Sequence, residues 1–359
     1  MDTSVLKSNR TKVIDIHAHM IALGGAETEE RYKEVMPYLS RDSSGRDVLM
    51  VRGQPRYSMP EQLYKTPIKI QEMDKTGVDV QALSIMPLFN YDIDPELGIG
   101  YSRIQNDAIA KVVKAHPNRF VGLATVPLQE PQEAAKELDR AMKELSLKGV
   151  EISNEVNGKN LDWPELWVFY EKAQELGAFI LCHPINPPGA ERMPKYHLLN
   201  LVGFPFATSL AIASVIFGGV LEDFPKLKLC FAHAGGFAPY QRGRLDHGYQ
   251  VRAECKEIIK KTPGEYFKLL YFDTITHYTP ALEYLIKTVG SDHVLLGSDS
   301  PFDMADSEPV ETVNRLASIS PVEKEKILGK NASKLLGIKV NSESTSKRDE
   351  ELGEALDTP

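Results

Sequence analysis

Two histidines, His17 and His19, stand two residues apart at the end of an apolar run near the start of the chain. Alternate side chains of an extended strand point to the same side, so both imidazoles can reach a single metal ion. Taken alone, this spacing fits a metal site and a pair of polar residues at a strand end about equally well.

Three further groups with the same chemistry follow apolar runs later in the chain. His183 ends the run 178–183, His233 ends the run 227–233, and Asp299 ends the run 293–299. Imidazole and carboxylate are ligands that suit zinc. A histidine in the core is an ordinary alternative for any one of these positions, but five such groups at strand ends favour one shared site.

The elements that must position these groups are eight short apolar runs, each followed by a segment able to form a helix. In the segment 131–145, for example, apolar residues recur at helical spacing. Strands that are apolar throughout are typical of a parallel sheet covered by helices. We therefore expect an α/β fold, a (β/α)8 TIM barrel, whose active site lies at the carboxyl ends of the strands. An open, doubly wound sheet is the alternative. The predicted strands are 13–19, 78–86, 120–127, 148–152, 178–183, 227–233, 269–274 and 293–299.

The connections indicate one barrel domain, 1–338, with a long insertion. About residues 20–65 separate the first strand from the helix expected near 66–76, and a connection of that length is typical of a lid or a small subdomain. Residues 339–359 are polar and lack aromatic side chains, so we expect a disordered tail.

Composition limits the classes of function. The 359 residues carry a net charge of −8, which argues against a nucleic-acid binder, because such a protein needs a basic face. Three cysteines cannot form a disulfide framework and the start of the chain is polar, so we expect a cytoplasmic protein. Residues 196–221 are uncharged, but their glycines and proline favour a helix near 206–217 over a membrane span. We expect no membrane partner.

These motifs together resemble the amidohydrolase superfamily, and more closely its branch of aminocarboxymuconate-semialdehyde decarboxylase-like enzymes. Beyond the histidines and Asp299, the similarity includes the sequences HP at 183–184, FPKLK at 224–228, LGSDSPF at 296–302 and NAS at 331–333. It extends over roughly residues 12–338.

The resemblance implies roles for the five groups. Four of them would bind one divalent metal, most often Zn2+ with Mn2+ as the alternative: His17, His19, His183 and Asp299. His233 would be the catalytic acid–base residue, and Asp299 would also be catalytic, as a proton shuttle. Lys148 lies at the wrong end of the fourth strand for the carboxylated lysine of two-metal relatives, which favours a single ion.

Arginines and a further histidine match substrate-binding positions. Arg56 in the insertion and Arg244 after the sixth strand correspond to residues that bind substrate carboxylates in the related decarboxylase. Arg52 competes with Arg56, because the alignment of the insertion needs a gap, and Arg244 could instead pair with Asp246. His277, after the seventh strand, could contact substrate or lie on the surface.

We therefore expect a metal-dependent decarboxylase, a carboxy-lyase that releases CO2 from an unsaturated or aromatic carboxylic acid. The alternatives are a hydrolase of an amide, lactone or carbon–carbon bond on the same site, and a non-catalytic binding protein that retains the fold. The sequence after Asp299 departs from that of the decarboxylase itself, which leaves the substrate more open than the chemistry. We also expect a homodimer, because residues 206–217 are apolar nearly all round.

Overall fold

The computed structural model describes residues 11–24, 28–56 and 59–338, and the predicted tail 339–359 lies outside them. Eight parallel strands form the central sheet, and each pairs with the strands before and after it in the chain. The first and last strands meet as well, since Ile16 N donates to Leu296 O at 2.9 Å and Ala18 bridges Ser300. The sheet thus closes into the predicted barrel. In order, the strands are β1 (Ile14–Met20), β5 (Val80–Ile85), β6 (Phe120–Ala124), β7 (Gly149–Ser153), β10 (Phe179–His183), β11 (Lys228–Phe231), β12 (Tyr271–Asp273) and β13 (Val294–Leu295).

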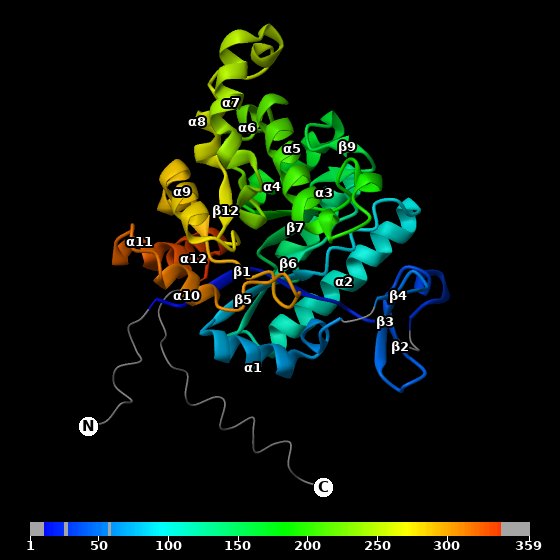
Figure 1. The fold of residues 1–359 in the computed structure, drawn as a ribbon. Helices are drawn as coiled ribbons and strands as arrows, with labels where there is room; N and C mark the ends of the chain where they lie inside the picture. Colours follow the sequence, from blue (N-terminus) through cyan, green and yellow to red (C-terminus); the bar gives the residue numbers. More distant parts are fainter. Residues whose placement is uncertain (1–10, 25–27, 57–58, 339–359) are drawn as a thin grey trace, which may run out of the picture.

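Helices surround this barrel (Figure 1). The predicted helix over 131–145 is α3, which begins with a proline in its first turn and buries Ala134, Leu138 and Ala141. The helices are α1 (Thr66–Thr76), α2 (Pro95–Ala115), α3 (Pro131–Lys143), α4 (Trp167–Leu176), α5 (Phe204–Phe217), α6 (Val220–Asp223), α7 (Ala238–Val251), α8 (Pro263–Tyr266), α9 (Thr279–Val289), α10 (Pro309–Asn314), α11 (Pro321–Glu325) and α12 (Asn331–Leu336).

The insertion after β1 contains an antiparallel sheet of its own, formed by β2 (Tyr38–Arg41), β3 (Asp47–Val51) and β4 (Gln54–Arg56). Arg52 and Gly53 both adopt positive φ, at 48° and 69°, which is typical of a tight two-residue hairpin. Leu49 and Val51 of β3 join a small buried cluster with Ile21, so the sheet is anchored beside the barrel (Figure 1). A shorter hairpin, β8 (Glu155–Val156) with β9 (Lys159–Asn160), follows β7.

Two strands differ from the expectation in ways that affect the site. The pairing of β1 with β5 shifts register between Asp15 and Ala18, and such bulges re-aim side chains. The eighth strand is only two residues long, so Asp299 lies four residues beyond β13 rather than at its end. Hydrogen bonds outside the ladder hold this segment: Asp299 N donates to His17 O, and His19 N donates to Ser300 O, both at 2.8 Å.

The apolar helix α5 is less exposed than its composition predicts. Half of its residues are buried against the rest of the chain, although Phe206 remains 42% exposed. The π-helical turn Leu199–Gly203 before it carries three more exposed apolar side chains, Leu199, Leu201 and Val202, of which Leu201 is 48% exposed. The stretch Leu199–Phe217 is long and apolar enough to cross a membrane by length and composition, which is weak evidence because core helices meet the same test.

Candidate metal centre

The structure brings together the four predicted ligands from three separate parts of the chain. One donor atom each from His17, His19, His183 and Asp299 lies within 4.8 Å of the other three, and all four residues are buried. Asp299 Oδ1 lies 3.3 Å from His17 Nε2 and 3.0 Å from His19 Nε2. Ligands about 2.0–2.1 Å from a tetrahedral zinc ion lie about 3.3 Å from one another, so this spacing suits one ion.

The other ring nitrogens of these histidines are already engaged. His17 Nδ1 contacts Asp273 Oδ2 at 2.8 Å, His19 Nδ1 contacts Ile85 O at 3.0 Å, and His183 Nδ1 contacts Pro184 O at 3.0 Å. Within the described part of the chain, the buried Nε2 of His183 has no hydrogen-bond partner. Metal-bound histidines characteristically donate their second N–H to a carboxylate or a carbonyl. The donor set therefore fits a divalent metal held by three Nε2 atoms and one carboxylate oxygen.

Burial and neighbouring charges shift the pKa values of three of these ligands. Burial opposes the charge of Asp299, but His17 and the hydrogen bonds from the histidines hold the pKa of its carboxyl well below the usual range. Burial, together with the neighbouring His233 and His17, lowers the pKa of His183 well below normal, so this ring is neutral. Burial would lower the pKa of His17 too, yet the carboxylates of Asp299 and Asp273 raise it well above its usual value. The two carboxylates that favour the charged form of His17 would also favour a bound cation.

His233 lies beside the four ligands rather than among them. Its Nε2 is 3.4 Å from Asp299 Oδ2, and its ring centroid lies 5.1 Å from that of His183. The backbone of His233 is left-handed, with φ of 53°, and its N–H donates to Asp273 Oδ2 at 2.9 Å. The side chain is 17% exposed, whereas His17 and His19 are completely buried. This position matches a residue that transfers protons at the edge of the site.

A cavity of about 290 Å³ adjoins this edge. His277, exposed and with φ of 53°, lines it together with His233 and Asp299, as the prediction for a substrate contact requires. No lysine or arginine occurs among the described residues that line it. The remaining lining residues are Asn200, Leu201, Phe204, Pro205, Ala234, Gly236, Phe237, Ile275, Thr276, Ala281 and Met304, most of them apolar.

The candidate arginines lie outside this cavity. Arg56 is the exposed last residue of β4, and Arg244 is exposed in the middle of α7. Asp246, the alternative partner of Arg244, pairs with Arg242 instead: its Oδ2 lies 3.7 Å from Arg242 Nε.

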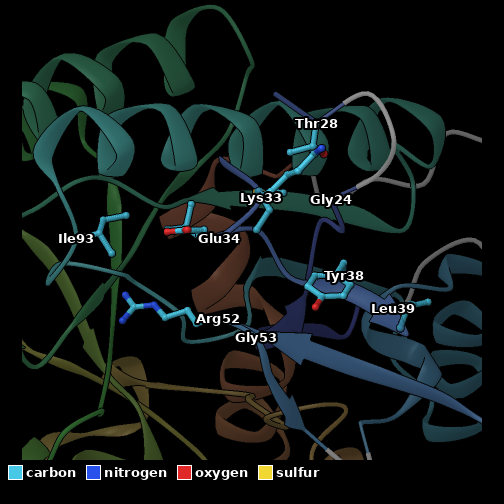
Figure 2. Close-up of a pocket in the computed structure, with 11 residues that line it drawn as sticks. Gly24, Thr28, Lys33, Glu34, Tyr38, Leu39, Arg52, Gly53 and Ile93 are labelled. Carbon is cyan, nitrogen blue, oxygen red and sulfur yellow. The ribbon is translucent and has the colours of Figure 1, made fainter. Parts of the chain in front are cut away.

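Arg52, the competitor of Arg56, has a defined structural role. It donates to both carboxylate oxygens of Asp92, at 2.6 and 2.8 Å, and to Asn90 Oδ1. These bonds tie the tip of the hairpin to the loop before α2. Arg52 also lines a separate cavity of about 900 Å³. Figure 2 shows it there with Glu34 and Ile93 nearby. Its guanidinium is therefore occupied within the chain.

Asp273 and Glu151 are buried carboxylates near the metal ligands that were not predicted. Asp273 ends β12 and accepts from His17 and from the backbone of His233, Ala234 and Ile275. An acidic residue at the end of an apolar strand is the signal that could have identified it. Glu151 of β7 is fully buried 3.7 Å from His19 Nδ1, and burial raises the pKa of its carboxyl well above normal. Its position inside the barrel wall gave no comparable signal.

Comparisons with known proteins agree with this geometry. The chain is 36% identical over 335 residues to 2-amino-3-carboxymuconate-6-semialdehyde decarboxylase from Dictyostelium discoideum, covering 92% of this chain and 93% of that protein. Among solved structures, 5-carboxyvanillate decarboxylase from Sphingomonas paucimobilis superposes with a TM-score of 0.77 at 24% identity, covering 92% of this chain and all of the other. A dihydroxybenzoic acid decarboxylase from Polaromonas, solved with manganese and 2-nitroresorcinol, gives a TM-score of 0.73 at 24% identity and covers 91% and 97%.

The expected barrel, the metal site and the resemblance to the decarboxylase branch are thereby confirmed. The family profile described as Amidohydrolase matches residues 14–338, almost the whole of the described structure. The chain belongs to the amidohydrolase family.

Proposed function

We propose that this protein is a metal-dependent carboxy-lyase that releases CO2 from an unsaturated or aromatic carboxylic acid. The observation that carries the proposal is the set of three Nε2 atoms and Asp299 Oδ1 converging at one edge of a cavity that also holds His233. The match to a decarboxylase over nearly the full length of both chains supports the type of reaction.

We propose one zinc ion, with manganese as the alternative. Three imidazoles and one carboxylate suit zinc, while the Polaromonas relative contains manganese. When bound, the ion supplies a positive charge that polarises an acidic substrate and stabilises the charge that develops during reaction. The chain itself orients the three histidine ligands, through Asp273 and the carbonyls of Ile85 and Pro184.

His233 is the residue best placed to move the proton that the reaction requires. When the carbon–carbon bond to the carboxylate breaks, CO2 leaves and its bonding electrons remain on the substrate carbon, which must take up one proton. His233 Nε2 lines the cavity and lies 3.4 Å from Asp299 Oδ2. We propose that His233 transfers this proton to the substrate carbon. Asp299 exchanges the proton with the imidazole ring of His233.

The lining of the cavity favours a flat, largely apolar substrate. Phe204, Phe237 and Leu201 can contact an unsaturated skeleton, and His277 offers a polar contact at the opening. A second carboxylate on the substrate would find no cation among the described lining residues, and the chain as a whole is acidic. Such a substrate needs an arginine from elsewhere.

We propose that Arg56 and Arg244 meet this need, Arg56 through the insertion and Arg244 by reaching the site of a second copy in a homodimer. Both guanidinium groups are exposed, and the apolar surface of Leu199–Gly203 lies beside the cavity that Leu201 lines. Guanidinium groups bind carboxylates through two parallel hydrogen bonds. We also propose a cytoplasmic location, with which the three free cysteines agree.

A panel of carboxylic acids tests the proposed reaction. Metal-loaded protein is incubated with hydroxybenzoic acids and with unsaturated mono- and dicarboxylic acids, while CO2 release and product mass are both followed. We expect loss of one CO2 from at least one acid, at a rate that His233→Ala lowers and that His247→Ala, an exposed histidine of α7, leaves unchanged. A product that gains water without losing CO2 would replace the lyase by a hydrolase.

A further inference from the structure

A buried carboxylate, Asp15, lies behind the metal ligands at the point where the barrel closes. It is completely buried and accepts four hydrogen bonds. Oδ1 accepts from His17 N at 3.1 Å and from Ser298 N at 3.0 Å. Oδ2 accepts from Ser298 Oγ at 2.6 Å and from Gln81 Nε2 at 3.0 Å.

Three of these four bonds come from the two segments that carry metal ligands, and the fourth comes from Gln81 of β5. His17 is itself a ligand, and Ser298 directly precedes the ligand Asp299. Neither segment is held by a regular ladder here, because β1 is bulged after Asp15 and β13 ends at Leu295. The carboxylate therefore joins the bulge of β1 to the segment after β13, where His17 Nε2 and Asp299 Oδ1 lie 3.3 Å apart.

We infer that Asp15 is a positioning residue of the metal centre, which sets the distance between His17 and Asp299 by holding the backbone N–H groups of His17 and Ser298. The inference rests on the metal site alone and is independent of the reaction that the site performs. Supporting groups of this kind typically change metal affinity by about 10–100-fold when they are removed.

A purely electrostatic role for Asp15 is the competing explanation. Lys69 of α1 is buried, has no hydrogen-bond partner for Nζ within the described part of the chain, and is attracted by Asp15. In that case the charge of Asp15 matters because it balances a buried cation, and the orientation of its oxygens does not.

Asp15→Asn separates these two explanations. The asparagine oxygen can accept from both backbone N–H groups, while its NH2 faces Ser298 Oγ, which can accept instead. The amide of Gln81 can turn as well, because its Oε1 has no hydrogen-bond partner among the described residues. The substitution thus keeps the geometry and removes the charge, whereas Asp15→Ala removes both.

Metal affinity measured by chelator competition with Zn2+ and Mn2+ is the direct readout, because it requires no substrate. We expect Asp15→Ala to weaken binding about 10–100-fold and to broaden the electron paramagnetic resonance spectrum of bound Mn2+. Asp15→Asn should bind close to the wild-type value. The matched control is Asp79→Ala, since Asp79 Oδ2 accepts from Val13 N at 2.8 Å before the start of β1, far from the ligands. This control should leave metal affinity unchanged.

Two results would overturn the inference: wild-type affinity in Asp15→Ala, or a loss in Asp15→Asn as large as that in Asp15→Ala. If Asp15→Ala does not fold, Asp15→Glu decides, because it retains the charge but its longer side chain moves the oxygens away from the N–H groups of His17 and Ser298. A several-fold loss of metal affinity supports the positioning role, and unchanged affinity contradicts it.

Discussion

Replacing Asp273 by asparagine tests whether this carboxylate orients His17 for metal binding. All four partners of this carboxylate are donors: Oδ2 accepts from His17 Nδ1 and His233 N, and Oδ1 accepts from Ala234 N and Ile275 N. Asparagine has one oxygen, so either orientation of its amide loses two bonds and places an NH2 group against two N–H donors. Hydrogen bonds to a charged group contribute about 1.5–3 kcal/mol each, so the total loss is about 3–6 kcal/mol.

Part of this loss should be measured as weaker metal binding. If the new NH2 faces His17, the ring must accept at Nδ1 and carry its proton on Nε2, the atom that would bind the metal. We expect metal affinity to fall about 10–100-fold, which corresponds to about 1.4–2.8 kcal/mol. The remainder should reduce the free energy of unfolding of the metal-free protein.

Chelator competition and thermal unfolding of the metal-free protein measure the two parts separately. The matched control is Glu137→Gln, because Glu137 is also buried and accepts several hydrogen bonds, from Asn106 and Arg140, but lies on α3. It should lower stability without changing metal affinity. Unchanged metal affinity in Asp273→Asn, with the protein folded, would refute the role we assign to this carboxylate.

Four further predictions concern the site. His17→Ala should lose both bound metal and turnover, measured by elemental analysis and CO2 release; full retention of both would remove His17 from the ligands. His233→Ala should slow turnover by about 10²–10⁴-fold while metal content stays intact, and a parallel loss of metal would make His233 a ligand instead. Arg244→Ala should raise KM strongly with metal still bound, and mixing it with His233→Ala should restore part of the activity in exchanged dimers; no recovery after demonstrated subunit exchange would contradict a shared site. Metal affinity should rise with pH, because the raised pKa of His17 means that the metal must displace a proton that is held most firmly at low pH. In the metal-free protein, stability should instead fall as the pH rises. The contribution of His17 to the free energy of unfolding is fully present below its unfolded pKa of about 6.5 and is lost as the pH rises through its higher folded pKa. Chelator competition and unfolding of the metal-free protein from pH 6 to 9 check both trends.

The barrel and the cluster of candidate ligands could be predicted from the amino-acid sequence. Uniformly apolar runs followed by helical patterns are local signals, and parallel strands in a closed barrel bring all their carboxyl ends to one face. A histidine or aspartate near the end of such a run therefore lies close to the others, whatever the details of packing. The five groups could be placed in one site for this reason, while the resemblance to the decarboxylases distinguished the ligands His17, His19, His183 and Asp299 from His233.

The groups that support those ligands could not be predicted, because they come from distant parts of the chain. The partner of His17 Nδ1 is Asp273, 256 residues away, and Asp15 meets Ser298 across 283 residues. No local pattern marks such pairs, because they depend on which residues a bulge or a shortened strand leaves facing each other. The same is true of Arg52, whose bonds to Asp92 and Asn90 depend on where the hairpin of the insertion packs, and of α5, half of whose residues packing leaves buried. The spacing of residues along the chain identifies which histidines and carboxylates are candidates for the site. Packing determines which of their atoms remain available to bind a metal or a substrate.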